Sequence, residues 1–361
     1  MVRRRSASFN AIAWDVEQYL RTEAVARRIE AIYREAIEEA VRIGLLVGMD
    51  RRGQDVPFSF DHLPQARLRT DRMLQLFAAR LMVLIQQGQE EAWLFASKKN
   101  DAMVQAIMGK SNLPKQVLER YGNRNLEALS AFQKRKVGGL GLSERVWRRA
   151  EQLEQELAMS LDLGLGEGMS AEQLSREVRQ HLNQPERLFR RYRDKRGALQ
   201  LSKNAKSCHP GQGVYRSSYK NAMRLTRTEV NMSYRESDHV RWQQLDFIVG
   251  FEVRKSNNHP APDICDELAG RYPKTFKFTS WHPHCRCHTV PIFATEGEID
   301  QLERMLLSGQ DTSRFGSVNA VRSVPASFRS WVNGNRDRIA RAKSKPLFVV
   351  DNLDEHLRFV G

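Results

Sequence analysis

Two short segments in the C-terminal half concentrate the side chains that could do chemistry. The first runs from His259 to Cys265, and the second is Trp281-His282-Pro283-His284-Cys285-Arg286-Cys287-His288. Thiolate and imidazole groups are soft ligands that zinc prefers, and four of them in a tetrahedron form a closed structural site. Cys265, Cys285 and Cys287, together with His282 or His259, supply such a set.

The Cys-x-Cys spacing of Cys285 and Cys287 leaves the state of the thiols open. In an extended strand, side chains two residues apart point the same way without converging, so a shared metal is harder to reach than with Cys-x-x-Cys. Structural zinc, a disulfide between Cys265 and one of the pair, and free thiols are therefore alternatives. Four cysteines in 361 residues are too few for a secreted disulfide scaffold.

Catalytic interpretations of the same residues are weaker. A closed four-ligand site leaves no position for the water that zinc hydrolysis requires. A cysteine nucleophile would need a base such as His282 or His284 beside it, and Glu229 is favoured as a buried salt-bridge partner of arginines over a general base. The sequence predicts a non-enzymatic protein. The rival hypothesis is a metal-dependent nuclease or toxin-type enzyme that uses His282, His284 and Glu229.

The charge of the chain predicts a polyanionic partner. Lys and Arg number 58 against 43 Asp and Glu, a net charge of +15. The span 170–228 holds 14 Lys or Arg and 4 Asp or Glu, with tyrosines and a phenylalanine between them. This pattern fits non-specific binding of double-stranded DNA, and it also fits a solvated basic surface or an amphipathic helix. The candidate DNA-binding residues are Arg187, Arg190, Arg191, Arg193, Lys195 and Arg196.

Helices must position most of these residues, because apolar residues recur at helical spacing through the first half. The predicted helices cover 13–47, 63–85, 90–108, 114–121, 126–136 and 143–161. We expect residues 44–53 to end the first helix. The predicted core includes Val16, Tyr19, Leu20, Leu68, Leu76 and Trp147.

The second half changes to mixed structure. A capping box of Ser170 and Gln173 opens a helix that ends before Pro185. A long helix follows, with Arg235 outside its apolar stripe. The predicted ranges are a helix at 215–245, strands at 247–253, 274–279 and 288–293, and helices at 298–307 and 325–342. A strand pair would bring the two cysteine segments together.

The predicted fold class is α+β, with a mainly helical N-terminal half followed by a smaller α+β domain that carries a Cys/His knuckle. The predicted domains are a helical assembly domain at 1–165, a basic α+β domain at 166–295 and a C-terminal helical extension at 296–361. No apolar run approaches the roughly 18 residues of a membrane span. Arg3-Arg4-Arg5 is not followed by the apolar core of a secretory signal.

Several short motifs occur in a familiar order over about residues 170–293. They are Arg227-Thr228-Glu229, then Asp246 to Gly250, then Asp263-Ile264-Cys265 with Gly270, then His282-Pro283-His284-Cys285-Arg286-Cys287 with Pro291. This order resembles the phage Mu F-like head morphogenesis family, the minor capsid proteins of tailed bacteriophages. Arg227, Thr228 and Glu229 correspond to a structural motif of that family. Relatives often carry Cys-x-x-Cys where Cys265 is followed by Asp266, so His259 or Asp263 would replace the missing ligand.

The resemblance implies a function in building the phage head. Such a protein is present in a few copies per particle and acts at the portal vertex. Its expected partners are the portal protein, capsid or scaffold proteins and double-stranded DNA, with no membrane. Its expected location is the virion head and, during assembly, the host bacterial cytoplasm. The expected cofactor is a structural zinc ion.

Overall fold

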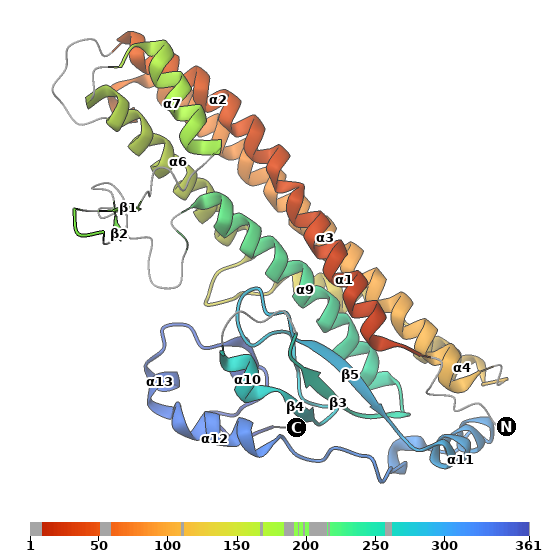
Figure 1. Ribbon diagram of the computed structural model, residues 1–361. Helices are drawn as coiled ribbons and strands as arrows, with labels where there is room; N and C mark the ends of the chain where they lie inside the picture. Colours follow the sequence, from red (N-terminus) through yellow and green to blue (C-terminus); the bar gives the residue numbers. More distant parts are fainter. Residues whose placement is uncertain are drawn as a thin grey trace. The chain divides into compact units, whose positions relative to one another are not determined.

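A computed structural model gives the architecture of the chain (Figure 1). It describes residues 9–50, 59–109, 112–166, 169–183, 191–193, 195–197, 199–201, 215, 217–256 and 262–360. Helices dominate, and the strands form a small antiparallel sheet and a short hairpin. The predicted mainly helical α+β class is confirmed. Within the described residues, none of the helices combines the length and the apolar character that a bilayer crossing requires.

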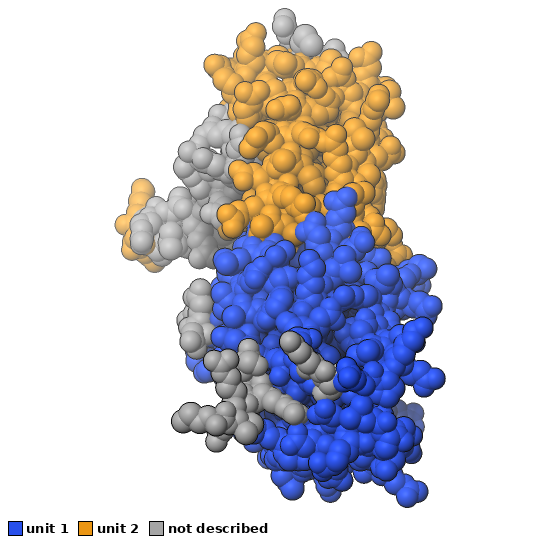
Figure 2. All heavy atoms as spheres, turned by 90° about the vertical axis from the view of Figure 1, so that its right-hand side faces the viewer, with its two compact units in different colours: residues 1–23, 87–140, 227–361 blue, residues 24–86, 141–226 orange. Residues whose placement is uncertain are grey.

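The chain divides into two compact units that are not contiguous in sequence (Figure 2). Unit 1 comprises residues 1–23, 87–140 and 227–361, and unit 2 comprises residues 24–86 and 141–226. Three helices contribute residues to both units: α1 (Ala11–Arg27), α3 (Pro64–Met108) and α9 (Ser218–Gln244). The division into sequence domains at 1–165, 166–295 and 296–361 stays a prediction.

Unit 2 is built around the packing of α2 (Ile29–Asp50) against α7 (Ala171–Asn183). Helix α2 continues through Gly44 and Gly48 to Asp50, which lies within the range 44–53 where the sequence predicts the end of the helix. The two glycines face α7: a Cβ on Gly48 would lie 2.6 Å from the Cα of Ala171. These residues therefore allow two helices to approach closely instead of ending one of them.

The predicted helices of unit 2 at 143–161 and from 170 are present, and the structure adds a 3₁₀ turn and a hairpin that the sequence does not predict. Helix α6 spans Leu142–Gly166, and a 3₁₀ turn covers Phe60–His62. The predicted capping box at the start of α7 is present, since Gln173 N donates to Ser170 Oγ and Ser170 N donates to Gln173 Oε1. Strands β1 (Arg191–Arg193) and β2 (Leu199–Leu201) form an antiparallel hairpin.

Unit 1 contains a three-stranded antiparallel sheet (Figure 1). Its strand order is β4 (Gly270–Tyr272), β3 (Ile248–Arg254), β5 (His288–Phe293). The shorter helices are α4 (Lys115–Gly122), α5 (Leu126–Lys134), α10 (Ile264–Leu268), α11 (Glu296–Leu307), α12 (Ala326–Gly334), α13 (Arg336–Arg341) and α14 (Leu347–Val350), with a 3₁₀ turn at Thr312–Arg314. A core of aromatic side chains joins the sheet to the C-terminal helices: Tyr272, Phe276, Trp281, Phe328 and Phe348.

Segment 274–279 is not a strand, although its composition predicts one. The Asn352 side chain takes the place of a neighbouring strand, because its Oδ1 accepts from Lys277 N at 2.6 Å and its Nδ2 donates to Lys277 O at 2.9 Å. The C-terminal region thus packs against segment 274–279 within unit 1. The third strand of the sheet is 270–272 instead, paired with β3.

Helix α3 is one 45-residue helix where the sequence predicts two pieces, 63–85 and 90–108. The intervening residues face α9: Gln89 Nε2 donates to Glu229 at 2.8 Å, and Ser233 Oγ donates to Gln89 O at 2.7 Å. These buried bonds hold the junction in helical form. Gly88 lies inside this continuous helix.

Several residues predicted for the core are exposed. They are Val16, Tyr19 and Leu20 on α1, Leu68 and Leu76 on α3, and Trp147 on α6. On α1 the buried face carries Gln18 and Thr22, whose side chains hydrogen-bond to each other at 3.0 Å. Spacing identifies an apolar stripe on a helix, and it does not identify which neighbour covers that stripe.

Candidate metal centre

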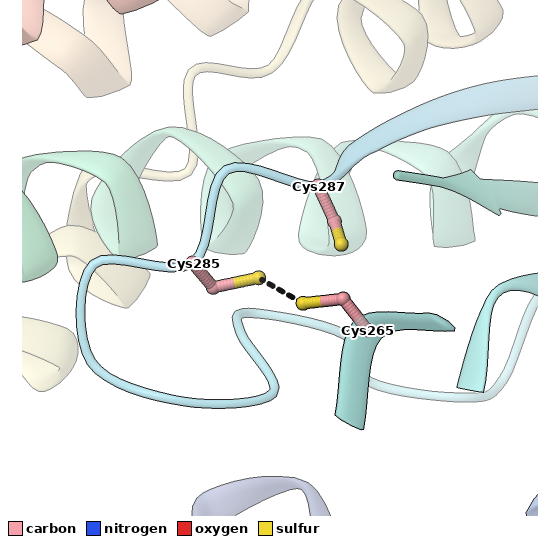
Figure 3. Close-up of side chains that lie close together, drawn as sticks. All are labelled: Cys265, Cys285 and Cys287. Atoms are coloured by element: carbon pink, nitrogen blue, oxygen red, sulfur yellow. Dashed lines mark hydrogen bonds between the residues drawn. The ribbon is translucent and has the colours of Figure 1, made fainter. Parts of the chain in front are cut away.

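Three cysteines and one histidine of unit 1 lie close together. Cys265 Sγ is 3.8 Å from Cys285 Sγ and 3.1 Å from His282 Nε2. The sulfur atoms of Cys265, Cys285 and Cys287 all lie within 4.8 Å of one another. Figure 3 shows the three thiols pointing toward one another. The cysteines are buried and none of these three forms a disulfide. This arrangement is a candidate metal site.

Local structure fixes Cys265 in the first turn of α10. Asp263 caps this helix, because its Oδ1 accepts a hydrogen bond from Cys265 N. In return, Asp263 N donates to Asp266 Oδ2. The capping box orients the short helix at its N-terminus. Helix α10 follows β3, and the other candidate ligands lie on the loop that leads into β5, so the central position of β3 brings both segments together.

A tight turn brings His282 and Cys285 to the same side of their loop. Cys285 N donates to His282 O at 3.1 Å, which closes a four-residue turn. Pro283 occupies its second position, where a fixed φ is favourable, and His284 occupies the third position with φ of 60°. The motif therefore encodes a turn as well as candidate ligands.

The two ring nitrogens of His282 have different surroundings. Nδ1 lies 2.9 Å from the carbonyl oxygen of Pro283, which can only accept a hydrogen bond. Nε2 faces Cys265 Sγ and Asp263 Oδ2, and with the proton on Nδ1 its lone pair is free to bind a metal. Backbone carbonyls commonly fix metal-bound histidines in this way.

Helix α9 holds the cysteine loop through three polar side chains on one face. Thr228 Oγ1 accepts from His284 N at 2.9 Å, and Asn231 Nδ2 donates to Cys285 O at 3.1 Å. Arg235 is buried and donates to three loop carbonyls, those of Thr279, Cys285 and Cys287. A loop without regular secondary structure thus has its carbonyls satisfied by α9.

Asn231 and Arg235 are site residues that sequence reasoning misses. Arg235 lies outside the apolar stripe of α9, and a charged residue there is expected to face solvent. The available signal is the spacing of Thr228, Asn231 and Arg235, which are three and then four residues apart and so share one face of the helix.

The three thiols have unequal acidity. Burial alone would raise the pKa of Cys285, but hydrogen bonds from Cys265 and Cys287 and the charge of Arg235 lower it well below its ordinary value. Hydrogen bonding with Cys285 and Cys287, and then burial, raises the pKa of Cys265. Among the three thiols, Cys285 is therefore the one whose thiolate is most stabilised by its surroundings.

The other residues of the Arg-Thr-Glu motif make structural contacts. Arg227 forms a two-pronged ion pair with Glu23, with distances of 2.8 and 2.7 Å. Glu229 is fully buried and lies 3.0 Å from Arg135. This is the buried ion pair that the sequence favours over a general base.

Candidate ligands other than His282 have different positions. Asp263 Oδ2 lies 3.3 Å from His282 Nε2, so Asp263, Cys265 and His282 form a second, overlapping group of donors. His259 lies outside the described residues, as does Cys208. Burial and the nearby Arg227 and Arg286 lower the pKa of His284 to about 4, so its ring is neutral at pH 7.

The candidate DNA-binding residues gather on the hairpin of unit 2. Arg191 and Arg193 belong to β1, and Lys195 and Arg196 lie in the exposed turn that follows it. Arg187 and Arg190 lie outside the described residues.

No protein-family model, no curated protein and no solved structure matches this chain. Its function is therefore inferred from its own residues.

Proposed function

We propose that Cys265, Cys285, Cys287 and His282 bind a structural zinc ion. The observation that carries this proposal is the 3.8 Å between the sulfurs of Cys265 and Cys285. Two thiolates on a tetrahedral zinc, each about 2.3 Å from the metal, are separated by about 3.8 Å. A disulfide would require about 2.05 Å.

The donor set supports a structural rather than a hydrolytic role. Four protein ligands complete the coordination of zinc and leave no place for a reactive water. The three thiols are almost fully buried, which also disfavours access by a substrate. Three thiolates and Zn²⁺ carry a net charge of −1, and the Arg235 guanidinium bound to the adjacent carbonyls offsets this charge.

Cobalt substitution tests the ligand set. We expect the apoprotein to bind Co²⁺ with the intense visible absorption of a tetrahedral thiolate site and to lose this absorption when Zn²⁺ is added. His282→Ala should weaken and shift the spectrum, and His284→Ala should leave it unchanged. A weak octahedral spectrum, or equal effects of the two variants, would exclude this coordination.

We further propose that the chain is a non-enzymatic minor head protein of the phage Mu F-like type. The support is that the motifs which resemble the family, although separated in sequence, form one contact network. Thr228 and Asn231 bind the loop of Cys285, and that loop faces Cys265. In this role the protein binds the portal protein, capsid or scaffold proteins and packaged double-stranded DNA.

The DNA part of this role follows from charge. A protein of +15 in a DNA-filled head gains affinity by releasing counterions from phosphates. The hairpin presents Lys195 and Arg196 to solvent. Binding that does not depend on sequence suits a protein that meets any packaged genome.

The experiment has two arms. We expect a duplex of arbitrary sequence to bind at low salt with an affinity that falls steeply as salt rises, and less tightly when Lys195 and Arg196 are changed to Gln. We also expect the chain to co-purify with the portal protein of its own phage. Absence of both interactions, or cleavage of the duplex that is lost with His282→Ala, would refute the proposal.

A further inference from the structure

Helix α1 exposes an apolar stripe in unit 1. Ile12, Val16 and Leu20 recur every four residues with exposed fractions of 45%, 55% and 57%, and Tyr19 lies beside them. The opposite face of the helix carries the buried Gln18 and Thr22. Helix α1 packs against unit 1 through that opposite face. Its apolar stripe is therefore left exposed by the described residues.

A groove of about 520 Å³ runs beside this stripe. One wall is formed by Ile12, Val16 and Tyr19, and the other by the end of β3 and the start of β5. The second wall carries three cations, Arg254, Lys255 and Arg286, and also His288. Arg254 and His288 are paired in the β3–β5 register, so they lie side by side at the end of the sheet.

Part of the basic wall is available to a partner. Arg286 lies over the ring of Tyr19 at 5.2 Å, and no carboxylate in the described part of the chain is within ion-pair distance of it. Arg254 and Lys255 have acidic neighbours, Glu252 and Asp266, but are themselves about half exposed.

The acidic residue in the lining does not neutralise the wall. Asp15 Oδ1 accepts from Tyr234 Oη at 2.8 Å and lies 3.5 Å from Lys99 Nζ, so its charge is engaged inside the unit. The groove therefore combines an apolar wall with a positive one.

We propose that this groove binds an amphipathic helix of a different protein, with apolar residues on one face and acidic residues beside them. An apolar helix face fills the stripe of α1, and its carboxylates pair with Arg286 and Arg254. A second copy of this chain fits poorly because each copy carries +15 and brings more positive charge to a basic wall. Nucleic acid fits poorly because phosphates gain nothing from Ile12, Val16 and Leu20.

The cysteine loop is part of this surface, since Arg286 lies between Cys285 and Cys287. The test therefore uses the full chain with its metal bound. The proposal does not depend on the head-assembly role, so one can fail without the other.

Fluorescence anisotropy with two synthetic helical peptides tests the proposal. Both carry leucines at helical spacing, and the remaining positions are glutamates in one and lysines in the other. We expect only the acidic peptide to bind. Val16→Asp should reduce its affinity by about tenfold or more, the usual loss at a central apolar anchor. Arg254→Glu should weaken the acidic peptide and strengthen the lysine peptide.

Val318→Asp is the matched control, because Val318 is 84% exposed on another part of unit 1. It should leave binding unchanged. Failure of the acidic peptide to bind, or equal binding by Val16→Asp and the wild type, would overturn the proposal. Self-association lost with Val16→Asp would assign the groove to a second copy instead. DNA binding lost with the same variant would assign it to nucleic acid.

Discussion

In unit 1, the loop 281–287 has no regular secondary structure, and side chains of α9 bind its backbone. In unit 2, α2 and α7 are regular helices whose close approach depends on Gly44 and Gly48. The loop is held by polar contacts and carries the candidate metal ligands, whereas the helix pair is held by shape complementarity. The two regions should therefore respond differently to chelators, to pH and to single substitutions.

Removal of the metal should have the largest effect, and it should be confined to unit 1. Structural zinc contributes about 10 kcal/mol or more of apparent free energy in small zinc-binding peptides. We expect chelation or Cys285→Ser to abolish protection of residues 265–287 in hydrogen exchange and to leave residues 171–183 protected. Cys208→Ser is the control and should change neither region. Equal loss of protection in both regions would refute the distinction.

Loss of Arg235 should be the next largest effect. Arg235→Met leaves the buried carbonyls of Thr279 and Cys287 without their side-chain donor, and Cys285 O keeps only the bond from Asn231. We expect unit 1 to lose about 3 kcal/mol or more in denaturant unfolding, since each unsatisfied buried group costs about 1–3 kcal/mol. Arg358→Met removes an exposed ion pair and should cost less than about 1 kcal/mol. Similar losses for both variants would show that α9 does not hold the loop.

A pH change should act in opposite directions at Glu156 of unit 2 and at the metal site of unit 1. Burial raises the pKa of Glu156 to about 7, although hydrogen bonds from Ser218 oppose the shift. The unfolded chain releases this proton near pH 4.5 and the folded unit 2 near pH 7, so unit 2 loses stability as pH rises between these values, by about 3 kcal/mol at most. The metal-bound unit 1 should instead lose stability as pH falls, because protons compete for its thiolates.

Glu156→Gln isolates this effect. Its side chain can still accept from Ser218 N and does not titrate. We expect the difference in melting temperature between variant and wild type to change between pH 5 and pH 8 in favour of the variant at high pH. A constant difference across this range would contradict a raised pKa at Glu156.

The smallest effect concerns the two glycines of α2. A Cβ on Gly48 would lie 2.6 Å from the backbone of Ala171, whereas on Gly44 the nearest atoms are 3.5 Å away. Gly48→Ala should cost about 1–3 kcal/mol through overpacking. Gly44→Ala fits without a clash and should stabilise α2 by up to about 1 kcal/mol. Urea unfolding of both variants gives the comparison, and equal effects would contradict close packing at Gly48.

The sequence predicts local features well and their partners poorly. Helical spacing and the Ser170–Gln173 capping box identify elements that the structure contains, because these signals act within a few residues. The exposure of Val16 and the single long α3 depend on which distant segment packs beside them. In the same way, the residue types identify Cys265, Cys285 and Cys287 as candidate metal ligands. The choice of His282 as the fourth ligand depends on the turn that brings it beside them.

Arg235 shows the same difference between what local sequence predicts and what distant segments decide. Its charge favours solvent when the helix is considered alone, and only the loop carbonyls packed against it explain its burial. The strand predicted at 274–279 fails for a related reason, since Asn352, far along the chain, occupies its hydrogen-bonding edge.

The most direct test of the central claim is the zinc content of the full chain, purified without added metal, with thiol reactivity measured on the same sample. We predict one zinc ion per chain and three thiols that react only after chelation. Chains without metal, in which every thiol reacts at once, would contradict a structural zinc site at Cys265, Cys285, Cys287 and His282.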